Sequence, residues 1–282
     1  MICTIGDLVE DVVVILSGPP RPGSDVDAQI SRHRGGSAAN VAAAAARLSG
    51  QARFVGQVGD DELGDRLASR LREDGVDVVT RRAGRTGTIV ALVAPDGERT
   101  MLTDRGASPR LDGTERAWLE GVAVLHVPAY SLAIEPLASS TRQLAELAHE
   151  AGIPVTIDTS SVAVLEAMDD PRQQFADLAP AIVFANRDEA DQLDLDNPLT
   201  DDGWLVIKRG ASPTMLTGPG SQRLEVPVLE VDVVDTTGAG DAFAAGFLTA
   251  WVDGAHPSQA AAAGHRAAAK VVTHPGSGVE DP

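Results

Sequence analysis

The sequence predicts an α/β fold in which helices cover both faces of a doubly wound, largely parallel β-sheet. The first observation is a recurring alternation, in which a short β-branched run is followed by a stretch of helical character. The second is size, because 282 residues, 43% of them hydrophobic, suffice for one large domain with a sizeable core. No Pro-, Gly- or Ser-rich linker divides the chain, so we expect residues 1–282 to form a single domain.

The alternation sets the order of the expected elements. The predicted strands are Ile2–Ile5, Arg53–Gln57, Val122–Val127, Val155–Asp158, Ile182–Ala185 and Leu205–Lys208. The predicted helices are Ala39–Leu48, Glu62–Glu73, Leu137–Ala151, Val162–Met168, Ala242–Trp251 and Ser258–Thr273. Short strands alternating with helices are typical of parallel strands joined by crossover helices.

Two regions break the alternation and predict a second, smaller sheet. Val12–Leu16 and Asp25–Ile30 flank a Pro/Gly-rich turn, and Thr88–Ala94 and Arg99–Thr103 flank an Asp-Gly pair, which is a strong hairpin signal. We expect these strands, inserted at about residues 12–31 and 88–103, to form a lid that excludes water from a reaction site.

The lid strands also predict an oligomer. A sheet this small cannot bury both of its faces alone. Its apolar side chains include Val12, Val14, Ile89, Val90 and Leu92. We therefore expect two chains to pack together through their lids as a homodimer.

Charge and composition exclude several classes of partner. The 41 acidic and 23 basic residues give a formal charge of -18, which repels nucleic acid and anionic lipid. The single cysteine, Cys3, excludes a disulfide within the chain. Neither a secretory signal nor an apolar run of about 20 residues is present, so we expect a soluble cytoplasmic protein.

The segment DTTGAGD at residues 235–241 carries the strongest chemical signal. It follows an extended apolar run, Leu229–Val234, and opens a helix. Gly238, Ala239 and Gly240 would bring backbone N–H groups to a helix N-terminus, where the helix dipole also attracts negative charge. The segment therefore predicts an anion site.

Asp241 follows those residues directly, so its carboxylate would face the anion. Like charges repel, so this carboxylate is a poor phosphate ligand but a good general base for a hydroxyl that attacks the phosphate. The alternative is a tight turn in which Asp241 only caps the helix. A dehydrogenase is disfavoured, because Phe243 occupies the third glycine position of the dinucleotide fingerprint and the segment lies late in the chain.

Two further segments place polar side chains at helix starts. Gly35 and Gly36 would let the backbone approach a ligand, and Asn40 would present its amide to a sugar hydroxyl. The alternative there is a plain helix start capped by Ser37. Asn186 and Glu189 follow a strand at i, i+3 spacing, which suits Mg²⁺ held largely through water, or alternatively a polar helix start.

Together these segments resemble the signatures of the ribokinase, or PfkB, family of carbohydrate kinases. Residues 35–40 resemble the first signature, 235–241 the second, and 186–189 the metal-organising motif. Asp11 matches a substrate-binding aspartate, and the segments at 58–64 and 97–99 also recur in the family. The order and spacing of these motifs fit over nearly the whole chain.

The resemblance implies a ribokinase-like fold and a reaction. The reaction is transfer of the γ-phosphoryl group of ATP to a hydroxyl of a sugar or sugar derivative. Asp241 would be the base, and the backbone amides of Gly238, Ala239 and Gly240 would stabilise the developing charge.

The resemblance also implies the full set of site residues. The substrate-binding residues would be Asp11, Gly36, Asn40, Arg105 and Asp241. The ATP-binding residues would be Asn186, Lys208, Gly210, Gly238, Gly240 and His265. Mg²⁺ would be organised through water by Asn186 and Glu189. Asp235 and Thr237 would offer oxygens to a monovalent cation, K⁺.

Departures from the family pattern leave the substrate open. No acidic residue lies at Val127–Tyr130, where ribokinases carry one, and Pro213 replaces a glycine of the nucleotide loop. One tyrosine and five phenylalanines offer few platforms for a nucleobase, which disfavours a nucleoside kinase of the same fold. A sugar or nucleotide sensor without turnover is the other alternative, although a sensor has no need of Asp241 as a base.

Overall fold

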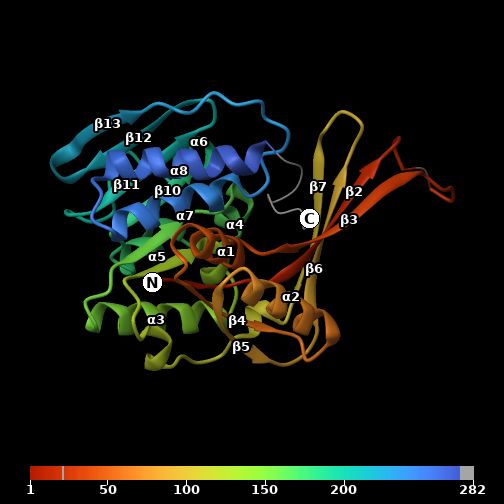
Figure 1. Ribbon diagram of the computed structural model, residues 1–282, viewed down its shortest axis with the longest axis horizontal. Helices are drawn as coiled ribbons and strands as arrows, with labels where there is room; N and C mark the ends of the chain where they lie inside the picture. Colours follow the sequence, from red (N-terminus) through yellow and green to blue (C-terminus); the bar gives the residue numbers. More distant parts are fainter. Residues whose placement is uncertain (21, 274–282) are drawn as a thin grey trace.

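The computed structural model describes residues 1–20 and 22–273, and in these ranges the strands form two separate sheets (Figure 1). The larger sheet has nine strands in the order β13-β12-β11-β10-β9-β8-β1-β4-β5. Strands β11 through β5 of that order pair in parallel, and β12 and β13 add an antiparallel edge. The strands are β1 (Ile2–Ile5), β4 (Ala52–Val58), β5 (Val76–Arg82), β8 (Val124–Pro128), β9 (Val155–Asp158), β10 (Ile182–Asn186), β11 (Trp204–Arg209), β12 (Ser212–Gly218) and β13 (Gln222–Val226).

Helices cover both faces of this sheet, as predicted. One face carries α1 (Ser37–Ser49), α2 (Glu62–Glu73), α7 (Ala239–Val252) and α8 (Pro257–Val272). The other carries α3 (Leu137–Glu150), α4 (Val162–Ala167), α5 (Pro171–Asp177) and α6 (Arg187–Gln192). Short 3₁₀ turns complete the set at Ser108–Arg110, Arg116–Leu119, Ala129–Leu132 and Pro219–Ser221.

Successive residues of a strand pack into two different hydrophobic cores, one on each face of the sheet. Ile2 and Phe54 belong to the core under α1 and α7, whereas Cys3, Ile5 and Val55 belong to the core under α3. This follows from the two-residue period of a strand, and it explains why the strands of a sheet covered on both faces read as continuous apolar runs. None of the helices in the described ranges has the length and apolar character needed to cross a bilayer.

The smaller sheet projects from the main body and has the order β3-β2-β6-β7 (Figure 1). Its strands are β2 (Val9–Leu16), β3 (Ala28–Gly35), β6 (Thr86–Val93) and β7 (Arg99–Gly106). Two antiparallel hairpins join through the parallel β2–β6 pair. The predicted hairpins are present, but the first is longer than expected and Asp25 lies in its connection rather than in a strand.

The register of the small sheet sorts its side chains onto two faces. Asp11 pairs with Ile89, and Ile89 pairs with Thr103, so Arg105 and Arg99, two and four residues from Thr103, share the face of Asp11. The opposite face carries the apolar side chains Val12, Val14, Val90, Leu92, Leu102 and Ile30, together with the charged Arg32 and Asp104. Ile89 therefore lies on the face of Asp11 and not with the other apolar residues from which we predicted a dimer contact.

Several elements were not predicted. The edge strands β5, β12 and β13 and the short helix α5 are additional, and Leu229–Val234 lies in neither sheet. Helix α6 corresponds to the polar helix start that was the alternative for Asn186 and Glu189. A β-strand and helix alternation carries no signal for an antiparallel hairpin at a sheet edge, so β12 and β13 were missed. The end of the run Leu229–Val234 is instead hydrogen-bonded to α8, where the Val234 N–H donates to the Val272 carbonyl at 2.7 Å.

Candidate active site

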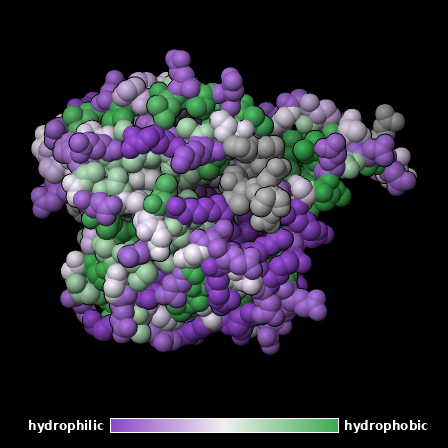
Figure 2. All heavy atoms as spheres, viewed as in Figure 1, coloured by the Kyte–Doolittle hydropathy of each residue, from purple (hydrophilic) through white to green (hydrophobic). Residues whose placement is uncertain are grey.

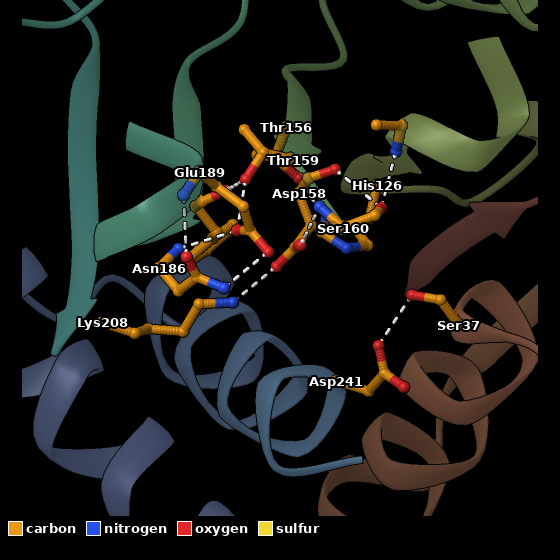
Figure 3. Close-up of polar contacts among 12 residues, drawn as sticks. Ser37, His126, Thr156, Asp158, Thr159, Ser160, Asn186, Glu189, Lys208 and Asp241 are labelled. Atoms are coloured by element: carbon orange, nitrogen blue, oxygen red, sulfur yellow. Dashed lines mark hydrogen bonds and ion pairs between the residues drawn. The ribbon is translucent and has the colours of Figure 1, made fainter. Parts of the chain in front are cut away.

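The site lies at the carboxyl edge of the large sheet, where parallel strands end together. Asp158 ends β9, Asn186 ends β10, and Lys208 of β11 pairs in register with Asn186. The first turn of α7 faces these strand ends and carries Asp241 (Figure 3). The fold thus brings together residues that are far apart in the sequence.

Asp241 is held by two side chains from the first turn of α1. The Ser37 hydroxyl donates to Oδ1 at 2.7 Å, and the Asn40 amide donates to Oδ2 at 3.0 Å. Burial raises the pKa of the Asp241 carboxyl to about 6, although the hydrogen bonds from Ser37 and Asn40 favour the ionised form. A carboxylate with this pKa is mostly ionised at neutral pH and can still accept a proton.

Ser37 is not the cap that the sequence suggested. Gly36, at φ 101°, occupies the N-cap position, and Ser37 is the first residue of α1. A side chain on Gly36 would overlap the backbone carbonyl of Asp7, and one on Gly35 would overlap the Asp11 carboxylate. The paired glycines therefore bring the backbone close to Asp11, and they leave the Ser37 hydroxyl turned toward Asp241.

The loop before α7 has the geometry of an anion site, with one change from expectation. Gly238 adopts a left-handed conformation at φ 76° and is the N-cap of α7. The Ala239 N–H donates to the Thr236 carbonyl at 3.1 Å, so this amide is engaged within the loop. The following first-turn amides, those of Gly240 and Asp241, belong to the set that no helix pairs internally.

Lys208 places a positive charge beside this helix start. A Cβ atom on Gly240 would lie 3.3 Å from Nζ of Lys208, so the ammonium group closely approaches the loop. Nζ also forms an ion pair of 2.8 Å with Asp158 (Figure 3). Burial would lower the pKa of Lys208, but the Asp158 carboxylate raises it, so the side chain stays charged. An anion at the start of α7 would thus meet a helix dipole and a fixed cation.

Asn186 and Glu189 form a capping box at the start of α6. The Asn186 side chain accepts from the Glu189 N–H at 2.9 Å, and Oε2 of Glu189 accepts from the Asn186 N–H at 2.8 Å. Oε1 accepts from Nδ2 of Asn186 at 2.7 Å, and the Thr159 hydroxyl donates to Oε2 at 2.6 Å.

These contacts limit how the pair would meet a metal ion. Glu189 is only 3% exposed and both of its carboxylate oxygens are engaged, so direct coordination of Mg²⁺ does not fit this arrangement. Within residues 1–20 and 22–273, no three His, Cys, Asp or Glu side chains are grouped to hold a metal ion. Water-mediated contact to Mg²⁺ stays a prediction.

Asp11 and Arg105 occupy one face of the small sheet. Burial raises the pKa of Asp11 to about 6, Arg34 lowers it, and Asp241 raises it. The Arg105 guanidinium pairs with Asp7 and lies 4.3 Å from the ring centroid of Tyr130, in a cation–π contact.

Arg99 occupies the oxygens that the family resemblance offers to K⁺. Its guanidinium donates to Asp235 at 2.7 Å and also contacts the Thr237 hydroxyl. Asp235 in turn accepts from the Thr237 N–H at 2.9 Å. These two side chains already bind a cationic group, so they do not fit K⁺ in this arrangement, and Arg99 brings a second positive charge to the anion loop.

Neither Gly210 nor His265 forms a hydrogen bond with Asp241. Gly210, at φ 60°, makes the tight turn between β11 and β12, and Pro213 is accommodated inside β12. His265 of α8 packs edge-on against Phe243 of α7, with ring centroids 5.1 Å apart. Their assignment to the nucleotide stays a prediction.

Four residues of this site were given no catalytic or binding role from the sequence: Ser37, Asp158, Arg34 and Arg99. Ser37 and Arg34 flank the paired glycines, and Asp158 ends a predicted strand at the carboxyl edge of the sheet. The position of Asp158 could have predicted its place in the site, because polar residues at the carboxyl ends of parallel strands lie close together. The pairings of Ser37 and Arg99 span 204 and 136 positions, and no local pattern reveals them.

Known proteins resemble this chain over most of its length. Fructokinase-1 from Zea mays is 33% identical over 233 residues, which cover 76% of this chain and 72% of the relative. An ATP-dependent ribose-1-phosphate kinase from Halopiger xanaduensis is 34% identical and covers 82% of this chain and 78% of its own length.

Solved structures share the fold. The crystal structure of adenosine kinase from Sinorhizobium meliloti superposes with a TM-score of 0.84 at 25% identity, covering 98% of this chain and 94% of that one. A sugar kinase from Pyrococcus horikoshii in complex with ATP, 22% identical, superposes with a TM-score of 0.82 over 98% and 94% of the two chains.

The family model described as pfkB family carbohydrate kinase matches residues 1–282, the full length of the sequence. These similar proteins are named kinases, and the mostly parallel sheet with its separate small sheet is the ribokinase-like architecture. The chain therefore belongs to the pfkB family of carbohydrate kinases.

Proposed function

We propose that this kinase transfers the γ-phosphoryl group of ATP to a hydroxyl of a sugar or sugar derivative. The observation that carries the proposal is the place of Asp241. Its carboxylate stands in the first turn of α7, beside amides and a lysine suited to phosphate, and two side chains fix its orientation. A base, an anion site and a fixed cation at one point are what phosphoryl transfer to a hydroxyl requires.

The proposed reaction moves one proton and one phosphoryl group. The sugar hydroxyl oxygen attacks the γ-phosphorus, the bond from that phosphorus to the β–γ bridging oxygen breaks, and ADP leaves. Asp241 accepts the hydroxyl proton while Ser37 and Asn40 hold its carboxylate in place. The α7 dipole and Lys208 stabilise the charge on the transferred group.

ATP is proposed as the phosphoryl donor, entering as its Mg²⁺ complex. The support is the relative named an ATP-dependent kinase and the similar sugar kinase whose structure contains ATP. In a chain of charge -18, the phosphates need local positive groups, and the candidates are Lys208, which approaches Gly240, and Arg99, which binds Asp235. Asn186 and Glu189 would meet Mg²⁺ only through water.

Asp11, Gly36, Asn40 and Arg105 are proposed to bind the sugar. A sugar is favoured because two similar proteins are a fructokinase and a ribose-1-phosphate kinase. A nucleoside is the second candidate, favoured by the similarity to an adenosine kinase. The only tyrosine, Tyr130, already stacks with Arg105, which leaves it less suited to a nucleobase.

An ADP-release screen tests the proposal directly. The panel contains ribose, fructose, fructose phosphates, ketogluconate derivatives and nucleosides, each assayed with ATP and Mg²⁺. Turnover of a sugar or sugar derivative supports the proposal, and turnover of nucleosides alone supports the second candidate. Binding without ADP release would instead indicate a sensor.

We also propose that the small sheet is a lid and that it joins two chains. Figure 2 shows hydrophobic residues on this projecting part of the molecule. On the face turned away from Asp11, Ile30 and Leu102 are 64% and 52% exposed, next to the half-buried Val14 and Val90. An apolar stripe of this kind is suited to packing against its own copy.

The first prediction concerns this contact. Sedimentation of the parent protein at micromolar concentration should give the mass of two chains. Leu102→Glu should shift the mass to one chain, because a charge would be buried in the contact. Met101→Glu, on the opposite face of the same strand, should leave the dimer intact. A parent protein with the mass of one chain would contradict the proposal.

The second prediction concerns Asp11. Asp11→Ala should weaken sugar binding about ten- to a hundredfold, because a lost hydrogen-bond partner of a hydroxyl costs roughly 1–3 kcal/mol. ATP affinity should stay near the parent value, since Asp11 lies on the small sheet rather than at the strand ends near Lys208. Calorimetry with each ligand measures both, and an equal loss of the two affinities would count against a sugar role.

The third prediction concerns the base. Asp241→Asn keeps the size of the side chain but cannot accept the proton, so kcat should fall by roughly 10²–10⁴. The variant should fold normally and bind ATP as tightly as the parent or more tightly, because one negative charge near the phosphates is gone. A residue that only capped the helix would cost about 1 kcal/mol of stability and leave kcat intact. Melting temperature, ATP affinity and kcat separate the two roles.

The fourth prediction is the pH dependence of turnover. The ionised carboxylate is the base, and the pKa of Asp241 is raised to about 6, so kcat/KM should fall as the pH drops through about 6. Ser37→Ala removes a hydrogen bond that favours ionisation, which raises this pKa further and should move the acidic limb to higher pH. Ser49→Ala, at the far end of α1, should leave the limb unchanged. If the acidic limb of kcat/KM lies at the same pH in Ser37→Ala as in the parent, the limb does not report the ionisation of Asp241.

A further inference from the structure

Arg34 lies on β3 beside the site, and it donates a hydrogen bond to Asn40. Its side chain is only 10% exposed. Nη1 donates to Oδ1 of Asn40 at 3.0 Å, and Nη2 lies 3.6 Å from Oδ2 of Asp74, the residue that ends α2. A guanidinium buried this far and aimed at a site amide is costly unless it is paired.

The contact decides which way the Asn40 amide faces. With Oδ1 turned to Arg34, Nδ2 is turned to Asp241 and donates to it at 3.0 Å. The reverse orientation would set an NH₂ group against a guanidinium and an amide oxygen against a carboxylate. Both contacts would then be repulsive, so the Arg34 charge selects one of two amide orientations of nearly equal shape.

We propose that Arg34 is a positioning residue for the phosphoryl transfer, fixing the Asn40 amide so that its NH₂ group serves Asp241 and the sugar. This inference rests on the proposed function. One amide hydrogen reaches Asp241, and the second is left for an oxygen of the sugar. Asn40 therefore offers donors only, and the sugar oxygen that meets it acts as an acceptor there.

Asp74 anchors the guanidinium from the other side. Its Oδ1 binds Arg47 at 2.5 Å, while Oδ2 faces Arg34. The chain of contacts runs from the end of α2 through Arg34 and Asn40 to Asp241 on α7. Arg47 shares the same carboxylate without touching Asn40, which makes it a matched control.

The test is a double-mutant cycle between Arg34 and Asn40, measured as sugar kinetics and as ATP affinity. Arg34→Met should lower kcat/KM for the sugar about ten- to a hundredfold, the usual cost of a lost charged hydrogen bond at a buried polar group, and should leave ATP affinity near the parent value. In an Asn40→Ala background the same change should cost less than about twofold, since no amide remains to be positioned. Arg47→Met should behave as the parent.

Asp74→Asn gives a milder second variant if Arg34→Met does not fold. It loosens the anchor, so it should lower kcat/KM several-fold in the parent background and not in Asn40→Ala. Additive losses in either cycle, or an equal loss in Arg47→Met, would overturn the inference while leaving the kinase reaction standing. Absence of turnover by the parent chain with every sugar of the panel would instead overturn the proposed function, and this inference with it.

Discussion

The hydrogen bonds from Ser37 and Asn40 to Asp241 join the start of α1 to the start of α7, and the arrangement of the site depends on this contact. The two helices pack on the same face of the sheet, so their first turns meet at its carboxyl edge. A buried carboxylate without partners would be strongly disfavoured. The two donors make its burial tolerable, and they fix the direction from which it can accept a proton.

A second constraint is the balance of charge in a very acidic chain. Each cation near the site is held by a carboxylate: Lys208 by Asp158, Arg99 by Asp235, Arg105 by Asp7 and Arg34 by Asp74. Such pairs place a positive charge at a defined point without leaving it buried alone. Part of the excess of acidic residues therefore fixes the position of the basic groups around Asp241.

These ion pairs place positive charges on both sheets. Lys208 is fixed to the large sheet, whereas Arg99 and Arg105 lie six residues apart on β7 of the small sheet and reach back to the main body at Asp235 and Asp7. Movement of the small sheet as a lid would thus carry two cations together. Asp241, on α7, stays on the main body with Lys208, so closure would add charge without moving this carboxylate.

The main layers could be predicted because their signals are local. The predicted strand Val155–Asp158 and helix Glu62–Glu73 have the observed bounds, and the helices predicted at Ala39–Leu48, Ala242–Trp251 and Ser258–Thr273 correspond to α1, α7 and α8. The edge hairpin of β12 and β13 was missed because it forms by pairing with β11, and its own sequence has no hydrophobic period that predicts this pairing. Leu229–Val234 has the composition of a strand, but it belongs to neither sheet, and its last residue bonds to Val272 at the end of α8 instead.

By itself, the sequence determined the α/β class, the family and the place of Asp241, because strand period, helix propensity and the run at 235–241 act within a few residues. Only the tertiary structure decided what holds that carboxylate. Ser37 and Asn40 lie 204 and 201 positions from Asp241, and Arg34 acts through one of them. A hydrogen bond depends on distance and direction in space, and spacing along the chain fixes these only within a helical turn or a strand pair.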